Sequence, residues 1–157
     1  MNNNIIAILI LLIFSNTAFA NVTLPNIFSD NMVLQRSSEV TIWGFANPQE
    51  EVVITPSWNN QEYKIKASNQ AKWEIKFPTP KEGGPYTISI KGYNEVVLKN
   101  ILIGEVWICS GQSNMEMNAS WGITNGEEAI KNASNPNIRF FTVPKLTATT
   151  PQNNLSG

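Results

Sequence analysis

The 157-residue sequence contains no histidine and only one cysteine. Histidine is the most common general base beside a serine nucleophile, so no Ser-His pair can be built from this sequence alone. The single thiol, Cys109, excludes a disulfide within the chain. Because Cys109 lies in an apolar stretch, we expect it to be a small core residue rather than a reactive group.

The sequence also lacks an excess of charge of either sign. It has 11 Lys and Arg residues against 12 Asp and Glu residues, for a formal net charge of −1. Without a basic patch, nothing indicates nucleic acid as a partner. No cluster of metal-ligating residues and no glycine-rich phosphate loop is present, so we predict no metal site and no cofactor.

The first 20 residues have the features of an export signal. A ten-residue apolar run, Ile5 to Phe14, is too short to span a membrane comfortably. The small residues of Ala18-Phe19-Ala20 then suit a signal peptidase, and we expect cleavage after Ala20. The segment before the run lacks Lys and Arg, so an uncleaved anchor or a buried strand stays open as an alternative. A signal peptide at 1–20 predicts a periplasmic or extracellular protein, without membrane attachment after cleavage.

Residues 21–101 have the pattern of an all-β segment. Apolar and polar residues alternate in most of several short runs, which is typical of antiparallel sheets with one dry face and one wet face. Turn residues such as Asn47-Pro48 separate the runs. Short strands at this spacing predict an antiparallel β-sandwich. The expected strands are 39–46, 51–58, 63–67, 73–77, 86–91 and one beginning at Glu95.

The aromatic residues of this segment have two interpretations. They are the side chains that carbohydrate-binding surfaces use, but Trp73, Phe77, Tyr63 and Tyr86 fall on the apolar phase of their strands. We therefore expect these four in the core, and Trp58 as the better candidate for an exposed ring. For the charged residues Asp30 and Arg36, a functional role stays open as an alternative, but we favour a structural pair that ties the opening loop to the sandwich.

Residues 102–157 change character. The runs 101–103, 106–109 and 138–143 are apolar without alternation, as buried parallel strands are. Between the last two runs, a possible cap at Asn125, early acidic residues and Lys131 predict a helix. Strand, helix and strand make one right-handed βαβ unit, the expected start of an α/β domain.

Ser113 occupies a distinctive place in this unit. It follows the strand expected at 106–109 and a Ser110-Gly111 turn, and it begins a helix-compatible stretch. There its Oγ can attack an ester carbonyl while its own backbone N–H helps to hold the oxyanion. The alternative is a serine that merely caps a helix. Glu105 and Glu116 flank this site, either as substrate-binding groups or as solvated or capping carboxylates.

The full string around Ser113 is more specific than this geometry. It closely resembles the first catalytic block of the sialate O-acetylesterase family, which belongs to the SGNH-type hydrolases. The matching residues are Gly104-Glu105-Val106-Trp107 and Cys109-Ser110-Gly111-Gln112-Ser113-Asn114-Met115-Glu116-Met117. The resemblance extends to 28–36 in the first segment, which looks like the N-terminal β-sandwich of these esterases, and to 136–144 in the second.

The resemblance implies a fold and a function. The fold is an antiparallel β-sandwich followed by the first βαβ unit of a flavodoxin-like SGNH-hydrolase domain. Ser113 is then the nucleophile, its neighbours Gln112 and Asn114 are candidates for substrate binding, and the substrate is an O-acetylated sugar or glycan, sialic acid by family analogy. No cofactor or metal is implied.

The sequence departs from the family in one respect. The family's base histidine and acidic aspartate lie near the end of a longer hydrolase domain, and neither can be mapped onto this sequence. We therefore expect a fragment that is inactive by itself, with a signal peptide at 1–20, a β-sandwich at 21–101 and an incomplete hydrolase domain at 102–157. The competing hypothesis is a secreted, non-catalytic β-sandwich module for carbohydrate binding or structural support.

Overall fold

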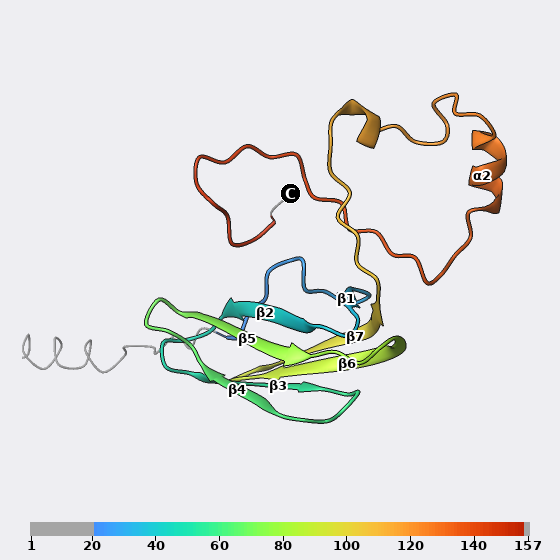
Figure 1. The fold of residues 1–157 in the computed structure, drawn as a ribbon. Coiled ribbons are helices and arrows are strands. Elements are labelled where there is room, and N and C mark those ends of the chain that lie inside the picture. The colour runs from blue at the N-terminus through green and yellow to red at the C-terminus, as the bar shows by residue number, and fades with distance from the viewer. Residues whose placement is uncertain (1–20, 156–157) are drawn as a thin grey trace, which may run out of the picture.

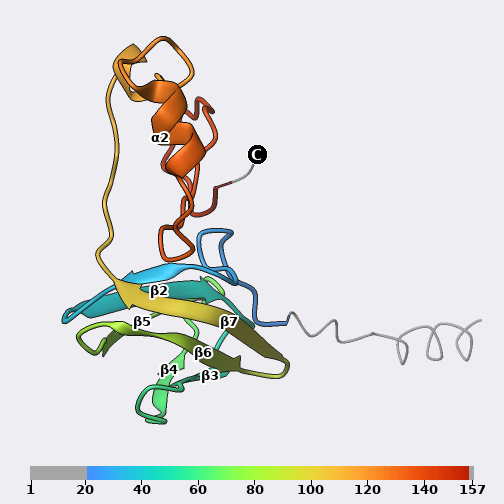
Figure 2. The same cartoon turned by 90° about the vertical axis from the view of Figure 1, so that its right-hand side faces the viewer.

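The structure is a computed structural model, and it describes residues 21–155. The signal peptide predicted for 1–20 lies outside these residues, so its cleavage after Ala20 stays a prediction. Residues 22–104, called the β unit below, carry all seven strands of the described part. Residues 105–155, called the arm, rise away from the β unit (Figures 1 and 2).

The β unit contains two sheets. One has five strands in the order β1-β7-β6-β3-β4, and the other pairs β2 with β5. Figure 2 shows β2 and β5 lying over the larger sheet. All strand pairs are antiparallel except β1 with β7, where Val33 lies opposite Leu102 in a parallel register. The bounds are β1 Val33–Gln35, β2 Glu39–Phe45, β3 Glu51–Pro56, β4 Tyr63–Lys66, β5 Lys72–Pro78, β6 Gly83–Lys91 and β7 Glu95–Gly104.

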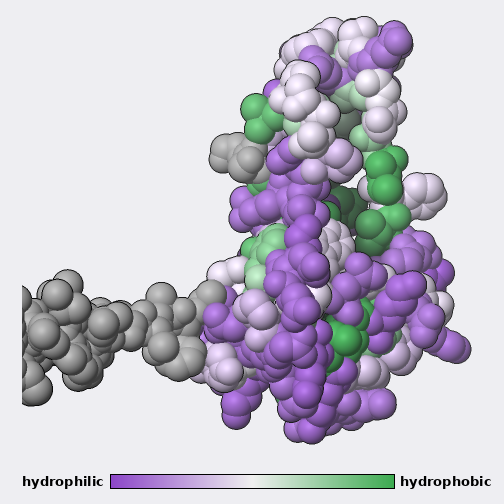
Figure 3. Space-filling model, turned by 90° about the vertical axis from the view of Figure 1, so that its left-hand side faces the viewer, coloured by the Kyte–Doolittle hydropathy of each residue, from purple (hydrophilic) through white to green (hydrophobic). Residues whose placement is uncertain are grey.

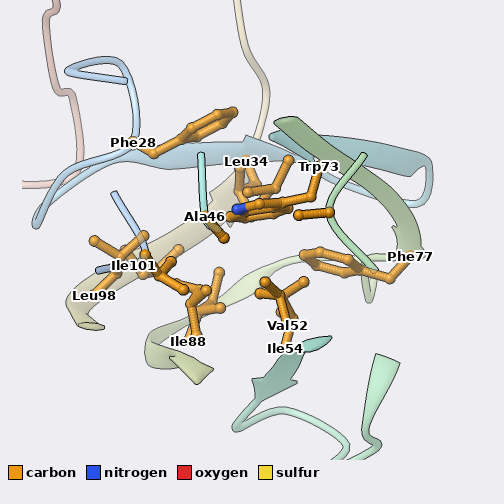
Figure 4. Packing of buried hydrophobic residues seen from close by; sticks show 14 of the residues in the cluster. Phe28, Leu34, Ala46, Val52, Ile54, Trp73, Phe77, Ile88, Leu98 and Ile101 are labelled. Carbon is orange, nitrogen blue, oxygen red and sulfur yellow. The ribbon is translucent and has the colours of Figure 1, made fainter. Parts of the chain in front are cut away.

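Alternating side chains from both sheets form one hydrophobic core (Figure 4). In β5, Trp73 and Phe77 are buried while the lysines between and beside them are exposed, as a period of two dictates. Ile42 of β2 and Ile88 of β6 are fully buried and belong to the same core cluster. The β-rich character predicted for the first segment is confirmed.

Glu50 carries a buried carboxylate that the sequence pattern did not reveal. Glu50 is 3% exposed, yet its oxygens accept hydrogen bonds from the backbone N–H groups of Asn47 and Tyr93, at 2.8 and 2.6 Å. A buried carboxylate is tolerated when such donors replace water. Glu50 therefore ties the β2–β3 turn to the turn between β6 and β7.

The arm contains little regular structure. Its elements are a 3-10 helix, η1 (Ser113–Met115), and one α-helix, α2 (Gly126–Asn132). The helix prediction is confirmed: Glu127 and Glu128 lie in the first turn and Lys131 lies in the last turn. Asn125 stands at the N-cap position with left-handed backbone angles, but its side chain makes no capping hydrogen bond. No helix among residues 21–155 has the length and apolar character that a membrane span requires.

The strands predicted at 106–109 and 138–143 are not formed, so the βαβ prediction is wrong for the described residues. Ile108 and Phe140 are 93% and 91% exposed, and Cys109 is exposed rather than buried. The physical reason is that neither run pairs with a strand of the β unit, and an extended run alone has no partners for its backbone groups. The third apolar run, 101–103, instead belongs to β7 and crosses the expected boundary after Ile101.

Two side-chain expectations are also wrong. Trp58 is not an exposed ring: it is partly buried, and its ring packs edge-on against Tyr86 with centroids 5.6 Å apart. Asp30 and Arg36 do not pair, because Asp30 accepts the backbone N–H of Lys99 while Arg36 binds Glu82 and Glu105. Trp73 and Phe77 are buried as predicted, and Tyr63 and Tyr86 pack against the core.

Candidate functional site

Ser113 is the first residue of η1 and is exposed. The preceding residue, Gln112, has extended backbone angles, and its carbonyl accepts the N–H of Met115 at 2.9 Å. The Ser113 carbonyl in turn accepts the N–H of Glu116 at 3.0 Å. The chain thus turns tightly at Ser113, and its side chain stands at the surface.

Gly111 explains how this turn closes. A Cβ atom at this position would lie 2.6 Å from Cγ of Met115, closer than side-chain atoms normally approach. The absence of a side chain at 111 lets Met115 fold back toward the backbone. Glycine at this position therefore has a packing role in the turn that presents Ser113.

The polar groups of this turn are free to meet a ligand. Within residues 21–155, neither the Ser113 hydroxyl nor its backbone N–H forms a hydrogen bond. Gln112 and Asn114 are exposed beside it, and their side chains likewise bind no other described residue. The structure thus brings the three predicted site residues together only as neighbours in the chain, and it adds no general base to Ser113.

The two flanking carboxylates are engaged in ion pairs. Glu116 pairs with Lys145 within the arm. Glu105 binds Nε of Arg36 at 2.6 Å and accepts the side-chain amide of Gln35 at 3.0 Å. These hydrogen bonds from Gln35 and Arg36 lower the pKa of Glu105, and the carboxylates of Glu105 and Glu82 raise the pKa of Arg36. Both glutamates therefore have a cationic partner: both oxygens of Glu105 accept hydrogen bonds within its network, whereas Glu116 uses one oxygen.

An open cleft of about 550 Å³ lies at the foot of the arm. Ser113 does not line it. Its lining is formed by Gln35, Arg36, Ser37, Lys81, Glu82 and Glu105. No group of three or more His, Cys, Asp or Glu side chains that could hold a metal ion occurs within residues 21–155.

The arm exposes many large apolar side chains. Figure 3 shows hydrophobic residues on the arm among intermediate and hydrophilic ones, whereas the β unit below presents a mainly hydrophilic face. The exposed large apolar residues of the arm are Val106, Trp107, Ile108, Met115, Met117, Trp121, Ile123, Ile130, Ile138, Phe140, Phe141, Val143 and Leu146. So many exposed large apolar side chains are unusual for a monomeric soluble protein, and surfaces of this kind are typically covered by another protein segment, a partner or a ligand.

Comparison with known proteins identifies relatives of this chain. No family model matches the chain. Sialate O-acetylesterase from Mus musculus is 31% identical over 149 residues, which cover 88% of this chain and 27% of that protein. Its Homo sapiens counterpart is 29% identical over 131 residues, covering 76% of this chain and 25% of that protein. Over most of its length, this chain is a homologue of the sialate O-acetylesterases.

A solved structure supports the same relationship in three dimensions. The crystal structure of a carbohydrate acetylesterase from Xanthomonas citri matches with a TM-score of 0.79 and 30% identity, over 87% of this chain and 31% of that one. A match over 87% of this chain includes more residues than 1–104 contain, so the matched region extends into the arm. The chain thus spans about a quarter of the length of the sialate O-acetylesterases it matches, and about a third of the solved acetylesterase.

Proposed function

We propose that this chain is the part of an exported carbohydrate acetylesterase that carries the nucleophile, Ser113. The reaction is the removal of O-acetyl groups from sugars or glycans, sialic acid being the first candidate by family analogy. The observation that carries the proposal is an exposed serine with a free hydroxyl and a free N–H, within a chain homologous to acetylesterases.

The chemistry divides into two steps. Ser113 Oγ attacks the acetyl carbonyl, the sugar alcohol leaves with a proton, and an acetyl-serine remains. Water then attacks this ester, and acetate and the free serine are released. The backbone N–H of Ser113 is the donor available for the oxyanion, while Gln112 and Asn114 are positioned to contact the substrate.

The proton acceptor is the missing component. The sequence contains no histidine, and the carboxylates on either side of Ser113 are held by Arg36 and Lys145. A hydroxyl without a general base is a weak nucleophile near neutral pH. The base and the remaining oxyanion donors therefore have to come from polypeptide equivalent to the part of the relatives outside the matched region.

The nucleophile is tested in a chimera in which residues 21–155 replace the matched part of the Xanthomonas citri acetylesterase. We expect acetate release from O-acetylated sugars, reduced by about 10³-fold or more in Ser113→Ala because the covalent step is lost. The matched control is Ser110→Ala, which removes an exposed hydroxyl three positions earlier and should leave turnover nearly unchanged. An active chimera whose Ser113→Ala variant retains its turnover would refute the assignment.

The chain by itself should behave differently. Because no general base is present, we expect hydrolysis of p-nitrophenyl acetate by the purified 157-residue chain to equal that of its Ser113→Ala variant. A rate clearly above that background would show that another group, such as a lysine, activates the serine.

A second candidate function is favoured by the same missing histidine. It is a secreted, non-catalytic module for carbohydrate binding or structural support, in which Ser113 is a remnant. Binding of an O-acetylated glycan by the chimera, without turnover and without an effect of Ser113→Ala, would favour this alternative.

A further inference from the structure

The segment 105–139 of the arm is attached to the β unit at both ends of one very short strand, while the end of the arm is held separately at Asn26, which donates to Asn154 and Leu155. This strand, β1, has only three residues, and it lies parallel to the end of β7. The arm leaves β7 after Gly104, beside Gln35 and Arg36 at the C-terminal end of β1. It returns at Arg139, which reaches Met32 at the N-terminal end of the same strand. The segment 105–139, which carries Ser113, is therefore a long loop with both ends at β1.

The first attachment is a network of four side chains and one backbone N–H. Gln35 donates its side-chain N–H to Glu105 and accepts the backbone N–H of Val106 at 2.8 Å, so it holds two consecutive residues of the arm. Arg36 binds the other oxygen of Glu105 through Nε, and its Nη1 binds Glu82 at 3.1 Å. Since Glu82 immediately precedes β6, Arg36 connects the start of the arm to a central strand of the β unit.

The second attachment uses the planar fork of another arginine. Arg139 donates through Nη1 to the carbonyls of Asn100 and Met32, and through Nη2 to Oδ1 of Asn100 at 3.1 Å. The Asn100 side chain in turn donates to Oδ1 of Asn31 at 2.6 Å. Both asparagines have left-handed backbone angles, with φ of 56° and 67°, which turns them toward the returning arm. Only a guanidinium can satisfy this set of acceptors with one side chain.

From these contacts we propose that Arg36 and Arg139 are positioning residues that close the loop 105–139 on β1 and thereby fix where Ser113 stands relative to the β unit. Neither side chain touches Ser113. The role in catalysis rests on the proposed function of Ser113, but the closure of the loop does not. The two arginines have different kinds of partner: Arg36 pairs with carboxylates, whereas Arg139 binds neutral oxygens.

The test measures the position of the arm directly. The chain's only cysteine, Cys109, is exposed and lies in the loop, so it takes one nitroxide label. A second label at Lys91→Cys, exposed at the end of β6, gives a reference point in the β unit. Pulsed EPR on the full chain then yields the distribution of distances between the two labels. We expect one narrow distribution for the native arginines.

The variants are Arg36→Gln, Arg139→Gln and the double substitution. We expect each single variant to broaden the distribution, and the double variant to broaden it further. Amide exchange at Val106 should accelerate roughly five- to tenfold in Arg36→Gln, the factor expected when one hydrogen bond of ordinary net strength is lost. The matched control is Lys64→Gln, which removes a surface ion pair with Glu62 within the β unit and should change neither quantity.

Conservative variants separate positioning from general charge effects. Arg36→Lys should restore most of the narrow distribution, since a lysine still pairs with Glu105, whereas Arg139→Lys should not, since an ammonium cannot bind both carbonyls and the amide. An unchanged distribution in the double variant, or broadening equal to that of Lys64→Gln, would overturn the proposal. Loss of amide protection in β6 would overturn it as well, because the arginines would then stabilise the β unit itself. No activity is measured, so failure of the esterase proposal would not affect this result.

Discussion

At the scale of single residues, partners in space decide which polar groups are available for chemistry. Glu105 and Glu116 flank Ser113 in the sequence, and each was a candidate for substrate binding. Each is instead held by a cation, Glu105 by Arg36 and Glu116 by Lys145. In contrast, the hydroxyl and the backbone N–H of Ser113 form no hydrogen bond with any of residues 21–155. The availability of its hydroxyl is therefore a property of the folded chain that sequence spacing alone did not establish.

Glu105 makes the attachment of the arm sensitive to acid. Hydrogen bonds from Gln35 and Arg36 lower its pKa from the ordinary value of a carboxyl group. A group whose pKa is lowered by folding contributes stability above its ordinary pKa, and this contribution is lost as the pH falls through the lowered value. We therefore expect the mobility of a nitroxide on Cys109 to be constant near neutral pH and to rise as the pH falls below the ordinary pKa of a carboxyl group.

The control for this prediction is Glu105→Gln. The other charged groups around the cleft are Arg36, Lys81 and Glu82, and they remain in this variant. If Glu105 is the titrating group, the variant should show high mobility at neutral pH and little further change in acid. An acid-dependent rise of the same size in the variant would assign the effect to a different carboxylate.

At the scale of elements, strand formation depends on available partners as much as on apolar content. The run 73–77 of β5 and the run 138–143 of the arm are both rich in aromatic and β-branched residues. β5 pairs with β2 along its whole length, and its inward side chains reach the core of the larger sheet. The run 138–143 pairs with no strand, and it stays irregular. The same local propensity therefore gives two outcomes.

Two phenylalanines allow this difference to be measured. Phe77 is fully buried, so Phe77→Ala should lower the free energy of unfolding by about 3–5 kcal/mol through lost burial and the cavity left behind. Phe140 is 91% exposed, and Phe140→Ala should change this free energy by no more than about 0.5 kcal/mol. Urea unfolding of the 157-residue chain and its two variants provides the comparison, and equal effects would contradict the packing described for the arm.

At the scale of the whole molecule, residues 21–155 form one hydrophobic core rather than two. The buried apolar residues all lie between Val22 and Ile103, whereas none of the large apolar residues of the arm is buried. The arm nevertheless belongs to the region matched by a solved acetylesterase, most of whose chain lies outside the match. The large apolar side chains of the arm are therefore exposed because no other part of residues 21–155 packs over them.

Amide hydrogen exchange should be slow in the β unit and fast in the arm. Ile90 lies in β6, which is paired with β3 and β7, and we expect its amide to exchange only on global unfolding. The amide of Phe140 has no partner in a sheet and should exchange at a rate close to that of an unfolded peptide. Comparable protection of Phe140 and Ile90 would show that the arm is packed in solution.

The sequence by itself determined the β unit, the helix near Asn125 and the relationship to the acetylesterases. These features depend on local information: a period of two, a set of helix-end residues and an uninterrupted motif around Ser113. Only the tertiary structure decided that 106–109 and 138–143 stay irregular, that Trp58 is partly buried, and that Arg36 binds Glu82 and Glu105 rather than Asp30. Each of these outcomes depends on a partner far away in the sequence, since a strand requires a neighbouring strand and an ion pair forms between the groups that the fold brings together.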